Sequence, residues 1–382
     1  MDFSLSEEHK MVRDMARKFA DQELKPIAAR IDQEHRHDDG VLRKMAENGF
    51  MGVAIPAEYG GAGMDYVAYA LILTEISRAC ASTGVIMSVN NSLYGFPVYT
   101  FGTEEQKIKF NTPVASGEAN GCYGLTEANA GSDPAGMKTS AVLDGDSWVI
   151  NGEKKFITNG NIAKYAVIAA VTDKTKGYKG ITQFVVDLEN TEGFSVGKVE
   201  EKLGIRGSGT AELVFQDARI PKDSILGDPG SGFKQMLTTL DSGRIGIASQ
   251  ALGIAKAALE ESVNYSKERV QFGKPISSFQ ATQFKLADMA TRIDASELLI
   301  LKAAWLESNH LPFEREAAQA KMFASDTAMD ATIEAVQILG GYGYSSEYPV
   351  ERLMRDAKIT QIYEGTNEIM RVVISRNVLG MR

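Results

Sequence analysis

The residue pattern changes type twice along the chain, and this change most constrains the fold. Residues 1–117 and 229–382 carry apolar residues mainly at helical spacing, whereas residues 118–228 carry short runs of β-forming residues between turn signals. No helical crossover interrupts the middle region, which favours an antiparallel barrel or sandwich over a parallel sheet. The pattern predicts an α+β protein with an N-terminal helical domain, a middle β domain and a C-terminal helical domain.

Both helical regions offer specific helix ends. Ser6 and Thr103 are good N-cap residues, each followed by acidic residues in the first predicted turn. A further helix is predicted over residues 66–79. The C-terminal region has three long stretches of helical periodicity, residues 245–266, 280–307 and 315–339. The last is predicted to end at Gly340-Gly341, and helices of such length are typical of bundles.

The middle region contains four predicted strands, residues 147–150, 165–171, 183–186 and 212–215. Asn151-Gly152 directly follows the first of them. Because this dipeptide adopts the left-handed backbone of a tight turn at little cost, it predicts a β-hairpin turn.

Charge and cysteine content exclude several classes of function. The net charge is 41 − 50 = −9, whereas a nucleic-acid binder needs clustered Lys and Arg against phosphates. Cys80 and Cys122 have no metal-binding spacing and indicate a reducing compartment without disulfides. Met1-Asp2-Phe3-Ser4 leads into the first helix without a signal or transit segment, and no long apolar run is present. We therefore expect a cytoplasmic protein without membrane insertion.

Two cofactor motifs are absent from the sequence. No Gly-x-Gly-x-x-Gly opens a helix after an N-terminal strand, so a nicotinamide-binding Rossmann domain is not expected. There is also no P-loop. His35-Arg36-His37-Asp38-Asp39 resembles a metal cluster in composition, but adjacent charges on a surface linker explain it better. We therefore expect no metal site.

The most distinctive chemical candidate is Glu364, within the stretch Ile362-Tyr363-Glu364-Gly365-Thr366-Asn367-Glu368-Ile369-Met370-Arg371. Thr366 is a good helix N-cap residue, and apolar residues follow it at helical spacing. Glu364 is therefore predicted on a tight turn just before a helix. There a carboxyl can act as a base, and the neighbouring peptide N–H can bind an oxygen of the same substrate. The alternative is an ordinary capped helix with a favourable acidic residue.

Three further stretches allow both a chemical and a plain structural interpretation. Residues 123–133 form either a loop whose N–H groups bind a phosphate or a flavin, or a polar loop between domains. Residues 155–160 offer an aromatic ring and a Thr hydroxyl to a planar cofactor, or are simply a strand. Residues 269–276 hold a pyrophosphate and stack on an adenine, or are a solvated loop.

These stretches occur in one order together with three others. The full series is Leu125-Thr126-Glu127 with Ala130-Gly131-Ser132-Asp133, Lys155-Phe156-Ile157-Thr158-Asn159, Leu203-Gly204-Ile205-Arg206-Gly207-Ser208, Arg269-Val270-Gln271-Phe272-Gly273-Lys274-Pro275, Gln337-Ile338-Leu339-Gly340-Gly341-Tyr342-Gly343-Tyr344, and Arg355-Asp356-Ala357 with Ile362-Tyr363-Glu364-Gly365-Thr366. In this order the chain resembles the acyl-CoA dehydrogenase family over essentially its whole length. It is most similar to the short-chain, butyryl-CoA-dehydrogenase-like branch.

The resemblance implies a C-terminal four-helix bundle and FAD held between the β domain and the bundle. It also implies a homotetramer in which a neighbouring subunit completes each FAD site. The implied reaction converts an acyl-CoA thioester to the 2-enoyl-CoA by proton loss to a base and hydride loss to flavin N5, and an electron-transfer flavoprotein accepts the electrons. The thioester oxygen would accept hydrogen bonds from the Glu364 N–H and a flavin ribityl hydroxyl.

The resemblance carries roles onto single residues, and Glu364 matches the catalytic base. The residues that match FAD contacts are Tyr123, Leu125, Thr126, Gly131, Ser132, Phe156, Ile157, Thr158, Arg269, Phe272, Gln280, Gln337, Gly340, Gly341, Thr366 and Glu368. The residues that match substrate contacts are Ser132, Asp241, Ser242, Gly243, Arg244, Tyr363 and Gly365. Of the first set, Arg269, Phe272 and the Gln337–Gly341 segment would reach the FAD of a partner subunit.

At Gly243 the chain agrees with most of the family, and at Ala128-Asn129 it departs from the family pattern. Branches that act on isovaleryl or long-chain substrates carry the base at the position of Gly243, so this chain follows the majority arrangement with Glu364. Ala128-Asn129 departs from the usual Pro followed by a small residue, which would loosen the loop beside the flavin, and Pro134 would compensate. We expect desolvation by substrate to raise the pKa of Glu364 more than the helix N-terminus lowers it.

Two other functions and several substrates stay open at this level. An acyl-CoA oxidase would share the fold, although such oxidases are usually much longer chains, and a helical scaffold could keep the fold without chemistry. Straight, branched and alicyclic acyl groups are all possible. Asn90 and Asn91 either line the acyl pocket or pack behind it.

Overall fold

The computed structural model describes residues 4–381, so the predicted chain start at Met1–Phe3 lies outside the described residues. Helices fill the first part. Their bounds are α1 Glu7–Phe19, α2 Ala28–Glu34, α3 Asp39–Glu47, α4 Tyr66–Ala79, α5 Ala81–Ser88, α6 Phe96–Phe101, α7 Glu104–Gln106 and α8 Thr112–Ala115. A π-helical segment, Val89–Gly95, joins α5 to α6.

The predicted helix ends in this part are confirmed. The Ser6 hydroxyl accepts a hydrogen bond from the His9 amide at 3.1 Å and so caps α1. Helix α4 covers the predicted residues. Thr103 forms a reciprocal capping box with Gln106, so that two backbone N–H groups at the start of α7 are satisfied.

The middle region forms a curled, seven-stranded sheet, in agreement with the predicted fold class. Its strands are β1 Asn120–Gly124, β2 Ser140–Asp144, β3 Ser147–Thr158, β4 Ala163–Val171, β5 Ile181–Asp187, β6 Phe194–Val199 and β7 Thr210–Pro221. The order is β1-β4-β2-β3-β7-β6, with β5 also paired to β4. Most pairings are antiparallel, but β4 runs parallel to β1 and to β2. Because β1 enters from the helical region rather than through a hairpin, its direction is not set by a turn.

Asn151-Gly152 is not a hairpin turn, so this prediction was wrong. The dipeptide lies inside β3, and Gly145-Asp146 makes the turn from β2 to β3. The pairing of β3 with β7 shifts register between Ile150 and Gly152, which marks a β-bulge. Gly152 has φ +145°, and a Cβ there would lie 2.5 Å from Thr139 Oγ1. The Asn–Gly pair is therefore used to bend a strand rather than to reverse it.

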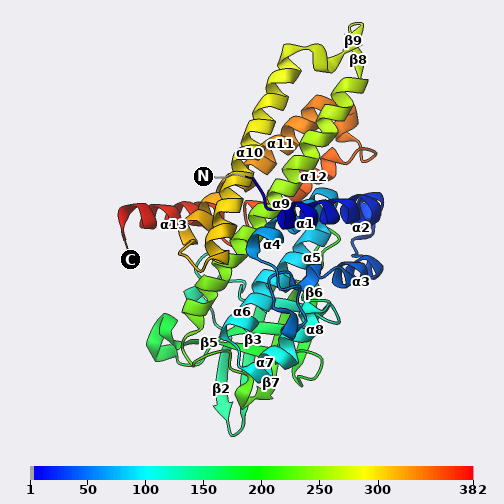
Figure 1. The fold of residues 1–382 in the computed structure, drawn as a ribbon. Coiled ribbons are helices and arrows are strands. Elements are labelled where there is room, and N and C mark those ends of the chain that lie inside the picture. Colours follow the sequence, from blue (N-terminus) through cyan, green and yellow to red (C-terminus); the bar gives the residue numbers. More distant parts are fainter. Residues whose placement is uncertain (1–3, 382) are drawn as a thin grey trace.

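The C-terminal region is a bundle of long helices, with a hairpin at one end. Its elements are α9 Gly232–Glu268, β8 Val270–Gln271, β9 Lys274–Pro275, α10 Gln280–Ser308, α11 Glu314–Leu339, α12 Val350–Thr360 and α13 Asn367–Leu379. Helix α9 begins earlier than its periodicity suggested, because the buried Gly, Ser and Thr residues of its first turns hide the apolar pattern. Gly340 caps α11 as predicted. The β8–β9 hairpin lies at the opposite end of the bundle from the sheet (Figure 1).

The N-terminal helices and the bundle share one core. Helix α4 packs along α9, and buried residues of α4, α5 and α9–α12 belong to a single apolar cluster. Gly253 permits the close crossing, since a Cβ there would lie 2.8 Å from the Arg78 amide nitrogen and would overlap the Thr74 carbonyl. The helical parts on either side of the sheet in sequence therefore form one scaffold.

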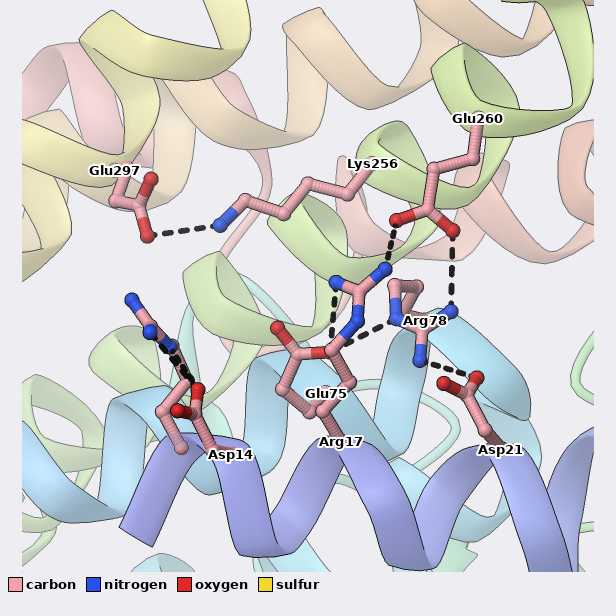
Figure 2. Close-up of polar contacts among 9 residues, drawn as sticks. Asp14, Arg17, Asp21, Glu75, Arg78, Lys256, Glu260 and Glu297 are labelled. Atoms are coloured by element: carbon pink, nitrogen blue, oxygen red, sulfur yellow. Dashed lines mark hydrogen bonds and ion pairs between the residues drawn. The ribbon is translucent and has the colours of Figure 1, made fainter. Parts of the chain in front are cut away.

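A buried ion-pair network ties α1, α4 and α9 together (Figure 2). Arg78 on α4 contacts Glu75 at 2.8 Å, Asp21 at 2.6 Å and Glu260 of α9 at 3.1 Å. Arg17 on α1 contacts Glu260 at 2.7 Å. Because the side chains of Arg78 and Glu75 are only 2% and 3% exposed, each charge depends on its partners for stabilisation.

Three further observations concern the described part of the chain. Cys80 and Cys122 are buried and unpaired. Between residues 4 and 381, no helix combines the length and apolar character needed to cross a bilayer. The same residues contain no group of three His, Cys, Asp or Glu side chains arranged to hold a metal ion.

Candidate active site

Glu364 lies on the turn between α12 and α13, as the sequence predicted. Its backbone is left-handed, with φ +54°, and Gly365 follows with φ +95°. Thr366 caps α13 by accepting a hydrogen bond from the Ile369 amide at 3.4 Å. The Asn367 amide donates to the Gln361 carbonyl at 3.0 Å and closes the turn. A glutamate in this conformation is strained, which is typical of functional turns.

The Glu364 carboxyl lies against the backbone of α9 at Gly243. A Cβ on Gly243 would overlap Oε2 of Glu364 and would lie 3.0 Å from Cδ2 of Leu93. Position 243 must therefore lack a side chain while position 364 carries this one. The two positions compared above from sequence share one space in the fold.

Burial dominates the electrostatics of Glu364. Residue 364 is partly exposed as a whole, but its Oε2 is buried and makes no hydrogen bond within residues 4–381. Burial raises the pKa of Glu364 to about 8, against the opposing charges of Lys321 and Arg244. We expected substrate binding to cause this rise, but the fold alone already produces it. A carboxyl with a pKa near neutrality is an effective proton acceptor.

The Glu364 backbone N–H is also available. No group of the described chain accepts a hydrogen bond from it. A carboxyl without a partner and an N–H without an acceptor therefore belong to one residue. Together they suit a substrate that loses a proton next to a carbonyl oxygen.

The predicted substrate stretch on α9 lies beside this turn. Asp241 accepts from Arg244 at 2.5 Å, and the Ser242 hydroxyl donates to the Tyr66 hydroxyl at 3.0 Å. Burial raises the pKa of Asp241 to about 7, while Arg244 opposes the shift. Arg244 Nε is buried and has no partner among residues 4–381, so the guanidinium retains a free donor.

Polar contacts join this turn to a buried part of α9. The Tyr363 hydroxyl donates to Gln250 Oε1, and Gln250 Nε2 donates to the Ala81 carbonyl at 2.9 Å. Gln250 lies two turns beyond Gly243 on α9, about 10 Å along the axis. Residues 242–255 of α9 are all buried, so Gln250 lies inside the fold.

Asn90 and Asn91 pack behind the site. Asn90 binds the side chain of Asn120 and the amide of Gly121, and Asn91 binds the backbone of Val53, Phe50 and Met87. Both side chains are buried and occupied by the fold. They are structural residues rather than pocket-lining ones.

The predicted flavin segments of the sheet lie next to one another. The Lys155 amide donates to the Thr126 carbonyl at 2.8 Å, which joins the loop after β1 to β3. Leu125 is buried, Thr126 is partly exposed, and Tyr123 is a core residue whose hydroxyl accepts from Gln183 at 2.7 Å. Gly131 and Ser132 are exposed, and a Cβ on Gly131 would meet nothing within 4 Å.

A buried ion pair anchors the loop that contains Ala128-Asn129. Lys154 Nζ donates to Glu127 Oε1 at 2.8 Å and to the Leu125 carbonyl at 3.2 Å. Asn129 Nδ2 donates to the Gly136 carbonyl at 3.0 Å. These contacts hold the loop in place without the proline that the family pattern has there.

Phe156 is presented by a strained bulge. The β3–β7 register shifts between Lys154 and Ile157, and Phe156 has φ +58°. Its ring is 60% exposed, while Ile157 is buried and Thr158 partly exposed. A large exposed ring on this strand suits a planar cofactor such as a flavin.

The second predicted cofactor group lies at the other end of the bundle. Arg269, Gly340 and Gly341 line a cavity of about 590 Å³ together with Tyr265 and Tyr342. The Arg269 guanidinium lies 5.7 Å from the Tyr342 ring centre. Phe272 lies at the tip of the β8–β9 hairpin and is 94% exposed. Gln280 and Gln337 are exposed nearby, at the start of α10 and the end of α11.

These two groups are not brought together within one chain. Arg269 follows Gly243 by 26 residues along α9, a rise of about 39 Å. The hairpin and the sheet lie at opposite ends of the molecule (Figure 1). The residues fit FAD as two separate half-sites, since each end offers an exposed ring and open backbone. Thr366, a helix cap, and the exposed Glu368 lie at the start of α13, directly after Glu364 and Gly365.

Two of the stretches that carry the family resemblance, residues 203–208 and 355–357, have a structural role. Ile205 donates its amide to Asp356 at 2.5 Å, and Arg355 pairs with Asp32 at 2.7 Å. A Cβ on Gly204 would lie 2.6 Å from the Asp356 amide nitrogen. The Leu203–Ser208 loop is thereby fixed against α12, which positions the turn that follows.

Sequence reasoning missed Gln250, Lys154 and Lys321. Lys321 is the one with a readable signal, because it interrupts a stripe of small residues, Ala317, Ala324 and Ala328, at helical spacing on α11. Gln250 and Lys154 carry no such signal, since their partners are distant in sequence.

Comparisons with known proteins cover the whole chain. Family models for the N-terminal, middle and C-terminal domains of acyl-CoA dehydrogenases match residues 6–118, 122–218 and 230–379. A short-chain specific acyl-CoA dehydrogenase of Clostridium acetobutylicum is 51% identical over 378 residues, which are 99% of this chain and 100% of that protein.

Solved structures agree with this similarity. Butyryl-CoA dehydrogenase from Megasphaera elsdenii superposes with a TM-score of 0.97 at 46% identity, over 99% of this chain and 100% of that one. A chain in a structure described as the electron transferring flavoprotein of Acidaminococcus fermentans superposes with a TM-score of 0.98 at 51% identity, over 99% of this chain and 100% of that one. An acyl-CoA dehydrogenase complexed with FAD from Bacillus anthracis superposes with a TM-score of 0.92 at 33% identity, over 99% of this chain and 67% of that one.

Proposed function

The chain belongs to the acyl-CoA dehydrogenase family, and on that premise we propose that it dehydrogenates short, straight acyl-CoA thioesters with Glu364 as the base. It is an FAD-dependent oxidoreductase. The observation that carries the proposal is the Glu364 turn, whose buried carboxyl and unbonded N–H converge beside Gly243.

Each of the site residues has its own role in the proposed reaction. Glu364 Oε2 takes the α-proton of the thioester, while the Glu364 N–H donates to the thioester oxygen and stabilises the charge that develops there. Bound FAD supplies the acceptor for the β-hydrogen, which leaves as hydride when the C=C bond forms. Phe156, Thr158 and the Thr126–Ser132 segment are the residues that would hold its ring and pyrophosphate near the sheet. Leu93 and the α9 backbone at Gly243 keep water from the carboxyl.

The hydrogen bond between Tyr363 and Gln250 supports a short acyl group. It joins the catalytic turn to the buried face of α9, about 10 Å inside Gly243. A Cβ on Gly246, one turn inside Gly243, would meet the hydroxyls of Ser88 and Tyr69 at 2.5 and 2.6 Å. These side chains leave little room along α9 beyond Gly243, which favours a short acyl group over a long or bulky alicyclic one.

Replacing Gln250 with Ala should lengthen the accepted acyl chain. The ratio of flavin reduction rates with octanoyl-CoA and butyryl-CoA should rise by about 10-fold or more, because a closed pocket end penalises each additional methylene. Stopped-flow reduction with a series of straight acyl-CoA thioesters measures this ratio. Gln22→Ala, an exposed change on the N-terminal helices, serves as the control. An unchanged chain-length profile in Gln250→Ala would place the end of the pocket elsewhere.

We infer that electrons pass to an electron-transfer flavoprotein rather than to oxygen. The similarity to a chain from a structure of that name supports this acceptor. Anaerobically reduced protein should transfer electrons to such a flavoprotein, with little peroxide formed when air is admitted. Stoichiometric peroxide on aerobic turnover would instead identify an oxidase.

We also propose assembly into a homotetramer. Arg269 and Phe272 lie too far from the sheet to serve the FAD half-site of their own chain, so a second copy is needed to join the halves. Exposed apolar side chains on α10 and α13 support contact between copies, namely Phe284, Leu298, Trp305, Val378 and Leu379. Sedimentation that gave the mass of one chain for the FAD-loaded protein would contradict this assembly.

A further inference from the structure

Lys321 lies in the middle of α11 and is fully buried. Its neighbours on the same face, Ala317, Ala324 and Ala328, belong to the apolar core of the bundle. A buried lysine in such surroundings loses its hydration, so it persists only where specific partners compensate.

Those partners belong to the catalytic turn. Lys321 Nζ donates to the Gly365 carbonyl at 2.7 Å and to Asn367 Oδ1 at 3.0 Å. Asn367 Nδ2 in turn donates to Ser325 Oγ at 2.9 Å and to Asp326 Oδ1 at 2.7 Å. Helix α11 therefore holds both residues that flank Thr366, and it fixes the conformation in which Glu364 has a positive φ.

The ammonium also faces the charge of the base. Glu364 is approached by Lys321 from α11, Arg244 from α9, and the hydroxyl groups of Tyr69 and Tyr363. Around Lys321 the charged groups are Glu364, Arg244, Asp326 and Glu368. Burial lowers the pKa of Lys321 to about 7, and among the opposing charges that of Glu364 has the largest effect. Burial therefore disfavours the charged forms of both Lys321 and Glu364, and a neutral amine can still donate to the Gly365 carbonyl.

We propose that Lys321 is a positioning residue of the reaction, whose buried amine holds the Glu364–Gly365 turn in place through its hydrogen bond to the Gly365 carbonyl. This inference rests on the proposed function of Glu364 as the base. An uncharged donor at position 321 should keep this role, because the hydrogen bond to Gly365 needs a donor and not a charge.

Lys321→Gln and Lys321→Met test this role by stopped-flow flavin reduction with butyryl-CoA at a pH above the pKa of Glu364. Gln can still donate to Gly365 and should keep most of the parent rate. Met cannot, and its rate should fall about 10-fold or more below that of Gln, as expected for a misplaced catalytic group. Lys302→Met removes an exposed cation of the same bundle and should reduce at the parent rate.

An infrared measurement gives a readout that does not depend on turnover. The carboxylic acid C=O band that Glu364→Gln removes should shift or broaden in Lys321→Met, because the turn is then no longer held, and should stay in place in Lys321→Gln. A reduction rate and an infrared band in Lys321→Met equal to those of Lys321→Gln would overturn the proposal. Failure of both variants to fold, with Lys302→Met folded, would also overturn it and assign Lys321 to the core alone. A parent protein whose flavin is not reduced by butyryl-CoA would contradict the proposed function instead, and the infrared band would still test Lys321.

Discussion

Glu364→Gln should slow flavin reduction by butyryl-CoA by about 10⁴-fold, at the upper end of what a positioned base contributes. The amide cannot accept the α-proton, and Gly243, which shares the space of this carboxyl, has no side chain that could replace it. The loss is a loss of chemistry rather than of structure. The variant should keep its FAD and its thermal midpoint, because Oε2 makes no hydrogen bond that the fold would lose.

Stopped-flow absorbance under anaerobic conditions measures this effect directly. Glu189→Gln, an exposed glutamate at the end of β5 paired only with Lys164 at 3.3 Å, is the matched control and should reduce at the parent rate. Reduction of the Glu364→Gln flavin at the parent rate would show that another group removes the proton.

Arg78→Met should lower the free energy of unfolding by about 3 kcal/mol, the low end of the range for breaking a buried ion pair. Glu75 would then remain buried with only Arg17 at 3.5 Å, and Asp21 and Glu260 would each lose a contact. This network crosses from α1 and α4 to α9, so the loss should loosen the shared core of the two helical parts (Figure 2).

Urea unfolding followed by circular dichroism tests the size of the effect. Arg219→Met breaks an exposed pair with Asp144, whose side chains are 54% and 63% exposed, and should cost less than about 1 kcal/mol. If the two variants lost equal amounts of unfolding free energy, burial would not make the Arg78 network more stabilising than an exposed ion pair.

Local signals predicted the elements well where the physics is local. Ser6 and Thr103 cap their helices, residues 66–79 are helical, and Thr366 begins α13 after the Glu364 turn. Each of these depends on contacts within about four residues along the chain. The Asn151-Gly152 prediction failed because the same backbone preference serves a bulge as well as a turn, and Thr139 on a neighbouring segment decides between them.

The site could be predicted only in part for the same reason. Glu364 was identified from its own turn and from the family pattern. What surrounds it comes from elsewhere, with Gly243 on α9, Lys321 on α11 and Leu93 on the π-helical segment. The raised pKa of Glu364 is a property of that assembled burial, so no motif near residue 364 contains it. The family resemblance already implied that Arg269 and Phe272 serve the FAD of a partner subunit, and the length of α9 fits that role.

We propose that this chain is a short-chain acyl-CoA dehydrogenase whose base is Glu364. Anaerobic addition of butyryl-CoA to the FAD-loaded protein tests this proposal most directly. We expect the flavin absorbance to be bleached rapidly, and longer straight-chain thioesters to bleach it progressively more slowly. Absence of bleaching by any acyl-CoA thioester, with FAD bound, would contradict it.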